Sequence, residues 1–165
     1  MAKPKAKSKS KSVDDRELVI TRIIDAPPEA VYRAWTDPKL VKRWFAPRPW
    51  STPRVAIDAR TGGSSLIVIR SPEGKEEPCP GVFLEVVPNE KIVVTDAYTS
   101  AWVPSGKPFM TVIVTFEPMR GKTRYTARVR HWSVADRERH EKMGFHEGWG
   151  RCTDQLAELV AKGLN

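Results

Sequence analysis

Short segments that alternate apolar and polar side chains fill residues 53–132, and this pattern limits the possible folds more than any other feature. Alternation with a period of two is typical of strands that bury one face. Turn residues such as Thr61-Gly62-Gly63 and Pro88-Asn89-Glu90 separate the segments. Parallel neighbours would need crossovers of roughly a dozen residues, so such short turns predict an antiparallel sheet. The expected strands are 53–59, 64–70, 81–87, 91–98, 109–117 and 123–132.

A further strand and two short helices are expected before this region. Residues 16–24 alternate well enough for a first strand. Residues 25–29 (Asp-Ala-Pro-Pro-Glu) then begin a helix, because proline in a first turn lacks only an N–H that would be unpaired there anyway. Asp37-Pro38 ends that helix, and a second one extends to Phe45. Their inward-facing side chains are expected to be Val31, Ala34, Trp35, Leu40 and Trp44.

The C-terminal residues from Ser133 to Gly163 have the pattern of one long helix. Ser133 followed by Asp136 resembles a capping box, and Gly163 can end the helix. Three glycines at 144, 148 and 150 each cost about 1 kcal/mol relative to alanine in a helix. They therefore indicate a kink or a close backbone approach. The face expected to be buried carries Phe145, Trp149, Cys152, Leu156 and Leu159.

The positive charge of the chain is concentrated at its start. The formal net charge is +8, and residues 1–12 contain five lysines and no acid. We expect residues 1–14 to be a disordered Lys-rich tail and residues 15–165 to form a single domain. Without the tail the charge is nearly balanced, so no specific nucleic-acid partner is expected.

Composition excludes several other classes of protein. Hydrophobic residues make up 40% of the chain and charged residues 29%, which is typical of a globular domain. No apolar run approaches the ~20 residues of a membrane span, and no apolar stretch follows the lysines as in a secretory signal. Cys79 and Cys152 are expected to be free thiols in a reducing compartment, so we expect a cytoplasmic protein.

Motifs along most of the chain resemble one known family, the Activator of Hsp90 ATPase homologue 1-like family. The resemblance spans roughly residues 16–162, and its segments occur in the family's order. The segments that carry it are Ile24 to Pro27, Val31 to Pro38, Leu40 to Phe45, Thr61-Gly62-Gly63, Gly81 to Pro88, Thr111 to Phe116, Glu147-Gly148-Trp149 and Leu156.

This family belongs to the START-like, or SRPBCC, superfamily. The resemblance therefore implies an α+β helix-grip fold, in which a curved antiparallel sheet of about six to seven strands surrounds a long C-terminal helix. It implies a hydrophobic cavity that binds a lipid or another apolar small molecule. It also brings Hsp90 as a candidate protein partner, although the co-chaperone's additional N-terminal domain has no counterpart here. A monomer and a weak homodimer are both compatible with the sequence.

Strand and helix parity predict which side chains line that cavity. Tyr125, Ala127, Val129 and His131 share one face of their strand, opposite a row of arginines. The neighbouring strands direct Met110, Val112 and Val94 to the same side. A large apolar lining with few polar groups is typical of small-molecule sites. The predicted ligand-binding residues are Trp44, Val94, Tyr98, Trp102, Met110, Val112, Tyr125, His131, Phe145, Trp149 and Cys152.

Two polar residues on this inward face are candidates for catalysis. Asp96 and His131 could act as a general acid/base or orienting pair if the strands bring them together. Alternatively, both lie near strand ends, reach solvent and bond locally. His140 and His146 are six residues apart on the predicted helix and are expected on the surface, so no metal site is predicted. No phosphate-binding Gly-rich loop or Ser-His-Asp signature is present, and no cofactor is expected.

Three functions fit these observations. The first is a binding module for a hydrophobic or amphipathic small molecule. The second is an enzyme of the cyclase, hydratase or hydrolase kind that uses Asp96 and His131. The third is an interaction protein that acts as a cofactor of a chaperone such as Hsp90. The first two need an accessible cavity, whereas the third does not.

Overall fold

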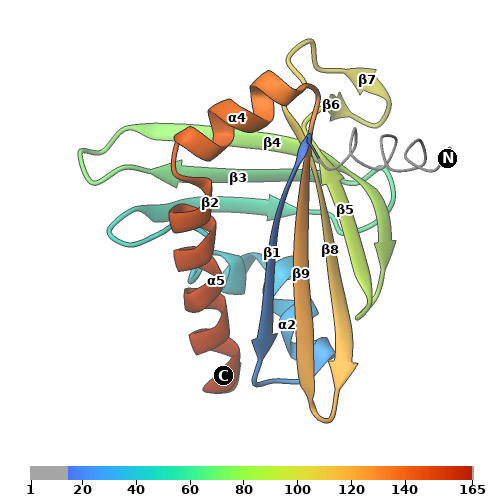
Figure 1. Ribbon diagram of the computed structural model, residues 1–165, viewed down its shortest axis with the longest axis vertical. Coiled ribbons are helices and arrows are strands. Elements are labelled where there is room, and N and C mark those ends of the chain that lie inside the picture. Colours follow the sequence, from blue (N-terminus) through green and yellow to red (C-terminus); the bar gives the residue numbers. More distant parts are fainter. Residues whose placement is uncertain (1–14, 165) are drawn as a thin grey trace, which may run out of the picture.

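A computed structural model of the protein describes residues 15–164, and the predicted Lys-rich tail (1–14) lies outside the described residues. A strand and two helices come first, the strands of the sheet follow, and two helices end the chain (Figure 1). The elements are β1 (Glu17–Ile24), α2 (Pro28–Thr36), α3 (Pro38–Val41), β2 (Ser51–Ile57), β3 (Ser64–Arg70), β4 (Glu76–Val87), β5 (Lys91–Thr95), β6 (Tyr98–Ser100), β7 (Val103–Pro104), β8 (Met110–Met119), β9 (Lys122–His131), α4 (Val134–Lys142) and α5 (Phe145–Ala161).

Seven strands form one antiparallel sheet in the order β1-β9-β8-β5-β4-β3-β2, and β6 pairs with β7 in a separate small hairpin. In Figure 1, β2, β3 and β4 run across the view whereas β1, β9 and β8 run along it, so the sheet is strongly curved. This arrangement confirms the α+β helix-grip fold that the family resemblance implies. The first strand closes the sheet against the last, with Glu17 opposite Arg130.

The predicted alternation along β8 and β9 is confirmed. Val114 lies opposite Ala127, and Phe116 lies opposite Tyr125. These four side chains are fully buried on the inner face, whereas the arginines of β9 are exposed on the outer face. Their burial places the hydrophobic core between the inner face of the sheet and helices α2 and α5.

Strand β4 begins earlier than the sequence pattern predicts. The predicted strand begins at Gly81, but β4 starts at Glu76 and contains Pro78 and Pro80. Residues 76–82 pair with β3 on one side, and pairing with β5 begins only at Val82. The prolines therefore lie where one edge of β4 is free, and there a missing backbone N–H removes no ladder hydrogen bond.

The C-terminal segment contains two helices, so the prediction of one continuous helix is wrong at Gly144. Gly144 has a φ of 96°, a left-handed conformation that a continuing helix cannot contain. Figure 1 shows α4 lying across one end of the sheet, in a different direction from α5. The predicted cap is confirmed, because the Ser133 hydroxyl accepts a hydrogen bond from the Asp136 N–H at 3.0 Å. The predicted apolar face of α5 is also confirmed, since Phe145, Leu156 and Leu159 are buried.

Candidate ligand-binding pocket

A pocket of about 510 Å³ lies between the inner face of the sheet and the helices. Strands β2 to β5 and β8 form one wall, and residues from α2, α3 and α5 form the other. Its lining residues are Trp35, Val41, Phe45, Ile57, Ser65, Ile67, Pro78, Cys79, Pro80, Gly81, Phe83, Val94, Thr95, Asp96, Tyr98, Thr99, Ser105, Lys107, Met110, Val112 and Trp149.

The sheet wall follows from strand register. Val94 on β5 lies opposite Val112 on β8, so both side chains point to the same face. Met110 is two residues before Val112 and therefore shares that face. Val112 is buried, whereas Val94 and Met110 are half-buried, because part of their surface faces the pocket instead of protein. This wall is a continuous apolar surface.

On the helix side, hydrogen bonds fix Trp35, which lines the pocket, and Trp44, which packs against it in the core. The Trp35 indole N–H donates to the Tyr125 hydroxyl at 3.1 Å. Burial raises the pKa of Tyr125 far above its usual value, so this hydroxyl stays neutral. The Trp44 indole N–H donates to the Ala34 carbonyl at 2.9 Å, and the rings of Trp35 and Trp44 lie 5.2 Å apart. The wall is therefore preorganised.

Gln155 of α5 ties the chain after α3 to the final helix. Its side-chain N–H group donates to the carbonyls of Trp44 and Ala46, both at 2.9 Å. Its carbonyl oxygen accepts from the Arg48 N–H at 3.0 Å. The buried Gln155 amide thus makes three hydrogen bonds to the backbone of residues 44–48. These bonds fix the position of Phe45 in the pocket wall.

Five of the predicted ligand-binding residues lie on the pocket wall: Val94, Tyr98, Met110, Val112 and Trp149. The candidate catalytic residue Asp96 lies there too. The structure does not place the other predicted residues on it: Trp44, Trp102, Tyr125, His131, Phe145 and Cys152.

The excluded residues lie either beneath the wall or outside the pocket. Tyr125, Trp44 and Phe145 are buried in the core. The Cys152 thiol donates to the Phe45 carbonyl at 2.8 Å, and burial raises its pKa to about 12. Trp102 is 54% exposed at the tip of the β6–β7 hairpin, where its ring packs against Tyr98.

Sequence reasoning missed part of the wall. Trp35 was predicted to face inward but was not named as a ligand-binding residue, and the direction of Phe45 was not predicted. Ile67 and Phe83 come from β3 and β4, where the apolar residues follow one another too closely for a clear alternation. Trp35 lies on the buried side of α2 with Val31 and Ala34, whereas Phe45 follows the end of α3 and has no helical signal of its own.

Asp96 and His131 do not form the predicted pair. The Asp96 Oδ1 atom accepts from the backbone N–H groups of Phe109 and Met110, at 2.8 and 3.1 Å. His131 bonds instead to the Arg16 carbonyl and to His140. Within residues 15–164 no hydrogen bond or ion pair connects Asp96 to His131. Asp96 is half-buried and bonds to a neighbouring strand, whereas His131 is 4% exposed, so the alternative expectation that both residues reach solvent is wrong for His131.

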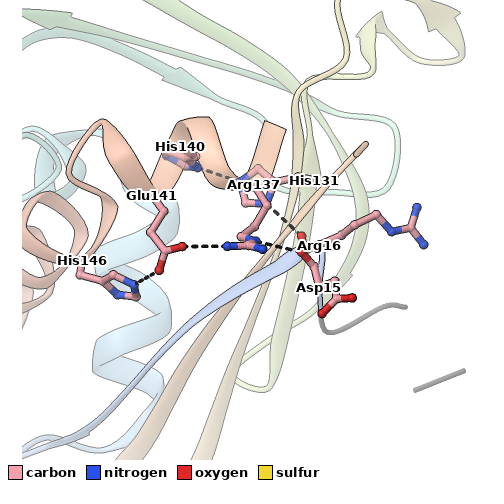
Figure 2. A network of polar contacts seen from close by, with 7 residues as sticks. All are labelled: Asp15, Arg16, His131, Arg137, His140, Glu141 and His146. Carbon is pink, nitrogen blue, oxygen red and sulfur yellow. Dashed lines mark hydrogen bonds and ion pairs between the residues drawn. The ribbon is translucent and has the colours of Figure 1, made fainter. Parts of the chain in front are cut away.

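His140 is buried, so the prediction of a surface histidine is wrong. The break at Gly144 turns α4 across the sheet and directs His140 toward β9. His131 Nε2 and His140 Nδ1 lie 2.8 Å apart, and His131 Nδ1 lies 3.0 Å from the Arg16 carbonyl oxygen (Figure 2). A carbonyl only accepts, so His131 Nδ1 donates and its Nε2 accepts from His140. Burial and the neighbouring His131 lower the pKa of His140 to about 4.

A second set of contacts holds α4 from its outer side. Figure 2 shows Arg137 between the N-terminal end of β1 and Glu141. Arg137 donates through Nε to the Asp15 carbonyl and through Nη1 to Glu141, both at 2.8 Å. Hydrogen bonds from His146 and Arg137 lower the pKa of Glu141. His146 is exposed, as the sequence predicts.

A second hollow, of about 540 Å³, lies on the outer face of the sheet between long side chains of β5, β8 and β9. Its charges are largely paired with neighbours. Lys91 lies 3.1 Å from Glu85, and Arg130 lies 2.6 Å from Glu17. The Lys91–Glu85 pair is exposed, whereas the Glu17 side chain is 6% exposed. The hollow combines these charged side chains with Val93, Ile113 and Trp132, whereas the lining of the inner pocket is mostly apolar and aromatic.

Within the described part of the chain, no three His, Cys, Asp or Glu side chains cluster as metal ligands would. Among the same residues, no helix combines the length and apolar character needed to cross a bilayer. Cys79 and Cys152 are free thiols, as predicted.

Comparisons with known proteins agree with this geometry. No protein of curated function matches the chain. The structure resembles that of protein NE0264 from Nitrosomonas europaea, with 38% identity, a TM-score of 0.86, and coverage of 90% of this chain and 96% of that one. Protein CV1439 from Chromobacterium violaceum is 26% identical, with a TM-score of 0.72 and coverage of 88% and 97%. Protein Ms6760 from Mycobacterium smegmatis shares the fold, with 23% identity, a TM-score of 0.76 and coverage of 90% and 92%.

The family model described as Activator of Hsp90 ATPase homolog 1-like protein matches residues 25–161. This range begins at the end of β1 and extends to the end of α5, so it includes every element that lines the pocket. The sequence resemblance is therefore confirmed, and the chain belongs to the Activator of Hsp90 ATPase homologue 1-like family.

Proposed function

We propose that the protein binds a hydrophobic or amphipathic small molecule in the pocket between the sheet and the helices. One observation carries this proposal: a pocket of about 510 Å³ whose walls are mostly apolar and aromatic. Small-molecule sites typically have volumes of about 300–1,000 Å³ and combine an apolar lining with a few polar groups. The fold is compatible with this role.

The driving force would be the hydrophobic effect. Val94, Val112 and Met110 on the sheet face Trp35 and Trp149 across the pocket. A ligand bound between these two walls would therefore have both of its faces removed from water. Each buried methylene contributes about 0.8 kcal/mol, so about eight carbons would contribute roughly 6 kcal/mol before the costs of association. A contribution of this size corresponds to a dissociation constant of about 40 μM before those costs, so we expect weaker binding than this for an eight-carbon compound and tighter binding for longer chains.

Native mass spectrometry of the purified protein and a tryptophan-fluorescence titration with fatty acids, sterols and polyaromatic compounds test the proposal. Trp149 lines the pocket, so a bound ligand should change its emission. We expect a co-purifying mass or a saturable fluorescence change. A folded protein that shows neither would refute the proposal.

A matched pair of variants on β5 tests whether the ligand binds in the inner pocket. Val94→Trp places a large ring in the pocket, whereas Val93→Trp places the same ring on the opposite face of the strand, where Val93 borders the outer hollow. We expect the Val94 variant to lose binding at least about tenfold and the Val93 variant to retain it, with both shown to be folded by circular dichroism. Equal binding by the two variants would place the ligand elsewhere.

Family membership also suggests an alternative to small-molecule binding, namely a protein-interaction role with Hsp90. This role does not need an accessible pocket, so the two Val variants separate it from small-molecule binding. If Hsp90 binding is measurable and is equal in both variants, the interaction uses another surface. We place the protein in the cytoplasm on the basis of its two free thiols, which are typical of reducing compartments.

A further inference from the structure

The polar groups of the pocket gather at one end. The apolar walls from α2, α5, β3 and β8 contain almost none of them. The polar lining residues instead follow the end of β5 and surround the β6–β7 hairpin, which lies at one end of the sheet in Figure 1. They are Thr95, Asp96, Tyr98, Thr99, Ser105 and Lys107, and the hydroxyl of Ser65 on β3 lies outside this group. The pocket therefore has an apolar body and a polar end.

Asp96 holds a fixed position at this end. The register of β5 with β8 ends at Thr95 opposite Thr111. Beyond it the Asp96 N–H donates to the Met110 carbonyl at 3.4 Å, and the Asp96 carboxylate adds side-chain contacts to the same segment. Its Oδ1 atom accepts from the N–H groups of Phe109 and Met110 at 2.8 and 3.1 Å. These two backbone donors orient the carboxylate without the help of a flexible side chain.

The second oxygen of Asp96 has no hydrogen-bond partner among the described residues. A carboxylate oxygen only accepts, so Oδ2 can be satisfied by a donor and not by another acceptor. Asp96 is half-buried and lines the pocket, so a ligand that fills the pocket would take water away from this oxygen. A ligand without a donor would then leave a charged acceptor unpaired, which is costly.

Lys107 is the one cation on the pocket wall in the part of the chain that the structure describes. It is exposed, and no ion pair fixes its position among the described residues. A flexible, solvated ammonium contributes little to an exposed pair. The fixed carboxylate of Asp96 should therefore decide which polar group is accepted.

We infer that the ligand is an amphipathic molecule whose polar end is a hydrogen-bond donor, an alcohol or an amine, placed on Asp96 Oδ2 with its apolar body between Trp35 and Trp149. This inference rests on the proposed function and narrows its ligand class. It excludes fatty-acid carboxylates as preferred ligands, because their head group is an acceptor with the same charge as Asp96.

Three ligands of equal chain length test the inference: 1-decanol, decylamine and decanoate, each below its micelle concentration at pH 7. Calorimetry with the wild-type protein should show the alcohol and the amine binding at least about tenfold tighter than the carboxylate. This ranking needs no variant. Equal affinities, or tightest binding of decanoate, would overturn the inference and leave the proposed function intact. Binding of none of them by the folded protein would instead contradict the proposed function.

Asp96→Asn identifies the responsible group. The Asn oxygen keeps both backbone hydrogen bonds, and its NH₂ group replaces Oδ2 with a donor. We expect the preference for the amine over the carboxylate to fall at least about tenfold, whereas Lys107→Met should leave the wild-type ranking unchanged. An unchanged ranking in the Asp96 variant, or loss of the ranking in the Lys107 variant, would show that Asp96 does not select the ligand.

Discussion

Replacing His140 by glutamine should change how the stability of the protein depends on pH. His140 is 9% exposed and lies between the rings of Phe109 and Phe145, with centroid distances of 5.1 Å to each. Its Nδ1 donates to His131 at 2.8 Å. Glutamine can keep a donor near that position but cannot titrate. The comparison therefore isolates the proton that the buried imidazole binds.

The sign of the effect follows from the pKa of His140. Burial and the neighbouring His131 lower this pKa from 6.5 to about 4. Between these two values the unfolded chain binds a proton at this position and the folded chain does not. The contribution of His140 to stability is thus fully present above pH 6.5 and is lost as the pH falls toward 4. The loss amounts to about 2 kcal/mol between pH 7 and pH 5.

Urea unfolding at pH 7, 6 and 5 measures this difference. We expect the wild-type protein to lose about 2 kcal/mol more than the His140→Gln variant over this range. At pH 7 the variant should be about 1 kcal/mol less stable, because its side chain loses aromatic contacts. His146→Gln is the matched control, since this histidine is exposed and its removal should leave the pH dependence close to that of the wild type.

Parallel stability curves for the wild-type and His140→Gln proteins would refute this reasoning. They would show that His140 binds its proton equally well in the folded and unfolded states. That result would mean that α4 leaves the sheet readily and exposes His140 to water.

Three further substitutions test contacts that position the pocket, each measured by urea unfolding at pH 7. Gly63→Ala should cost more than about 3 kcal/mol, because a Cβ atom there would lie 1.9 Å from the Asp58 carbonyl oxygen. Gln155→Leu should cost about 3 kcal/mol, since it leaves two carbonyls of residues 44–46 without their donors. Tyr125→Phe should cost about 1–2 kcal/mol, because the indole N–H of α2 loses its acceptor.

Gly148→Ala is the control for the glycine substitution. A Cβ atom at this helical position meets no atom within 4 Å, so the change should stabilise the protein by up to about 1 kcal/mol. Equal effects at Gly63 and Gly148 would contradict the steric argument. Wild-type stability of the Gln155 and Tyr125 variants would show that solvent or a shifted neighbour replaces their hydrogen bonds.

The sheet was predictable because its signals are local. Turn residues and short connections determine antiparallel pairing, and the alternation along β8 and β9 determines which face is buried. The same reasoning placed Val94, Met110 and Val112 on the pocket wall. Trp149 was predictable from the helical spacing of the residues after Gly144.

The residues that were misplaced depend on how elements are joined in space. The position of His140 depends on Gly144, where the sequence permits both a kinked helix and a continuous one. Trp44 and Tyr125 face inward as predicted, but other side chains lie between them and the pocket. The alternation of side chains along a strand predicts the face to which a residue points, but it does not predict whether the residue reaches the pocket surface or lies beneath it. For the same reason, two inward-facing residues such as Asp96 and His131 need not meet.

Binding in the inner pocket is the central claim, and an NMR titration of the tryptophan indole N–H signals with 1-decanol tests it most directly. Trp35 and Trp149 line the pocket, whereas Trp132 is 53% exposed and borders the outer hollow. The account predicts saturable shifts of the Trp35 and Trp149 signals at ligand concentrations that leave the Trp132 signal in place. Shifts at Trp132 without shifts at Trp35 and Trp149 would contradict the account, as would a folded protein in which no indole signal moves.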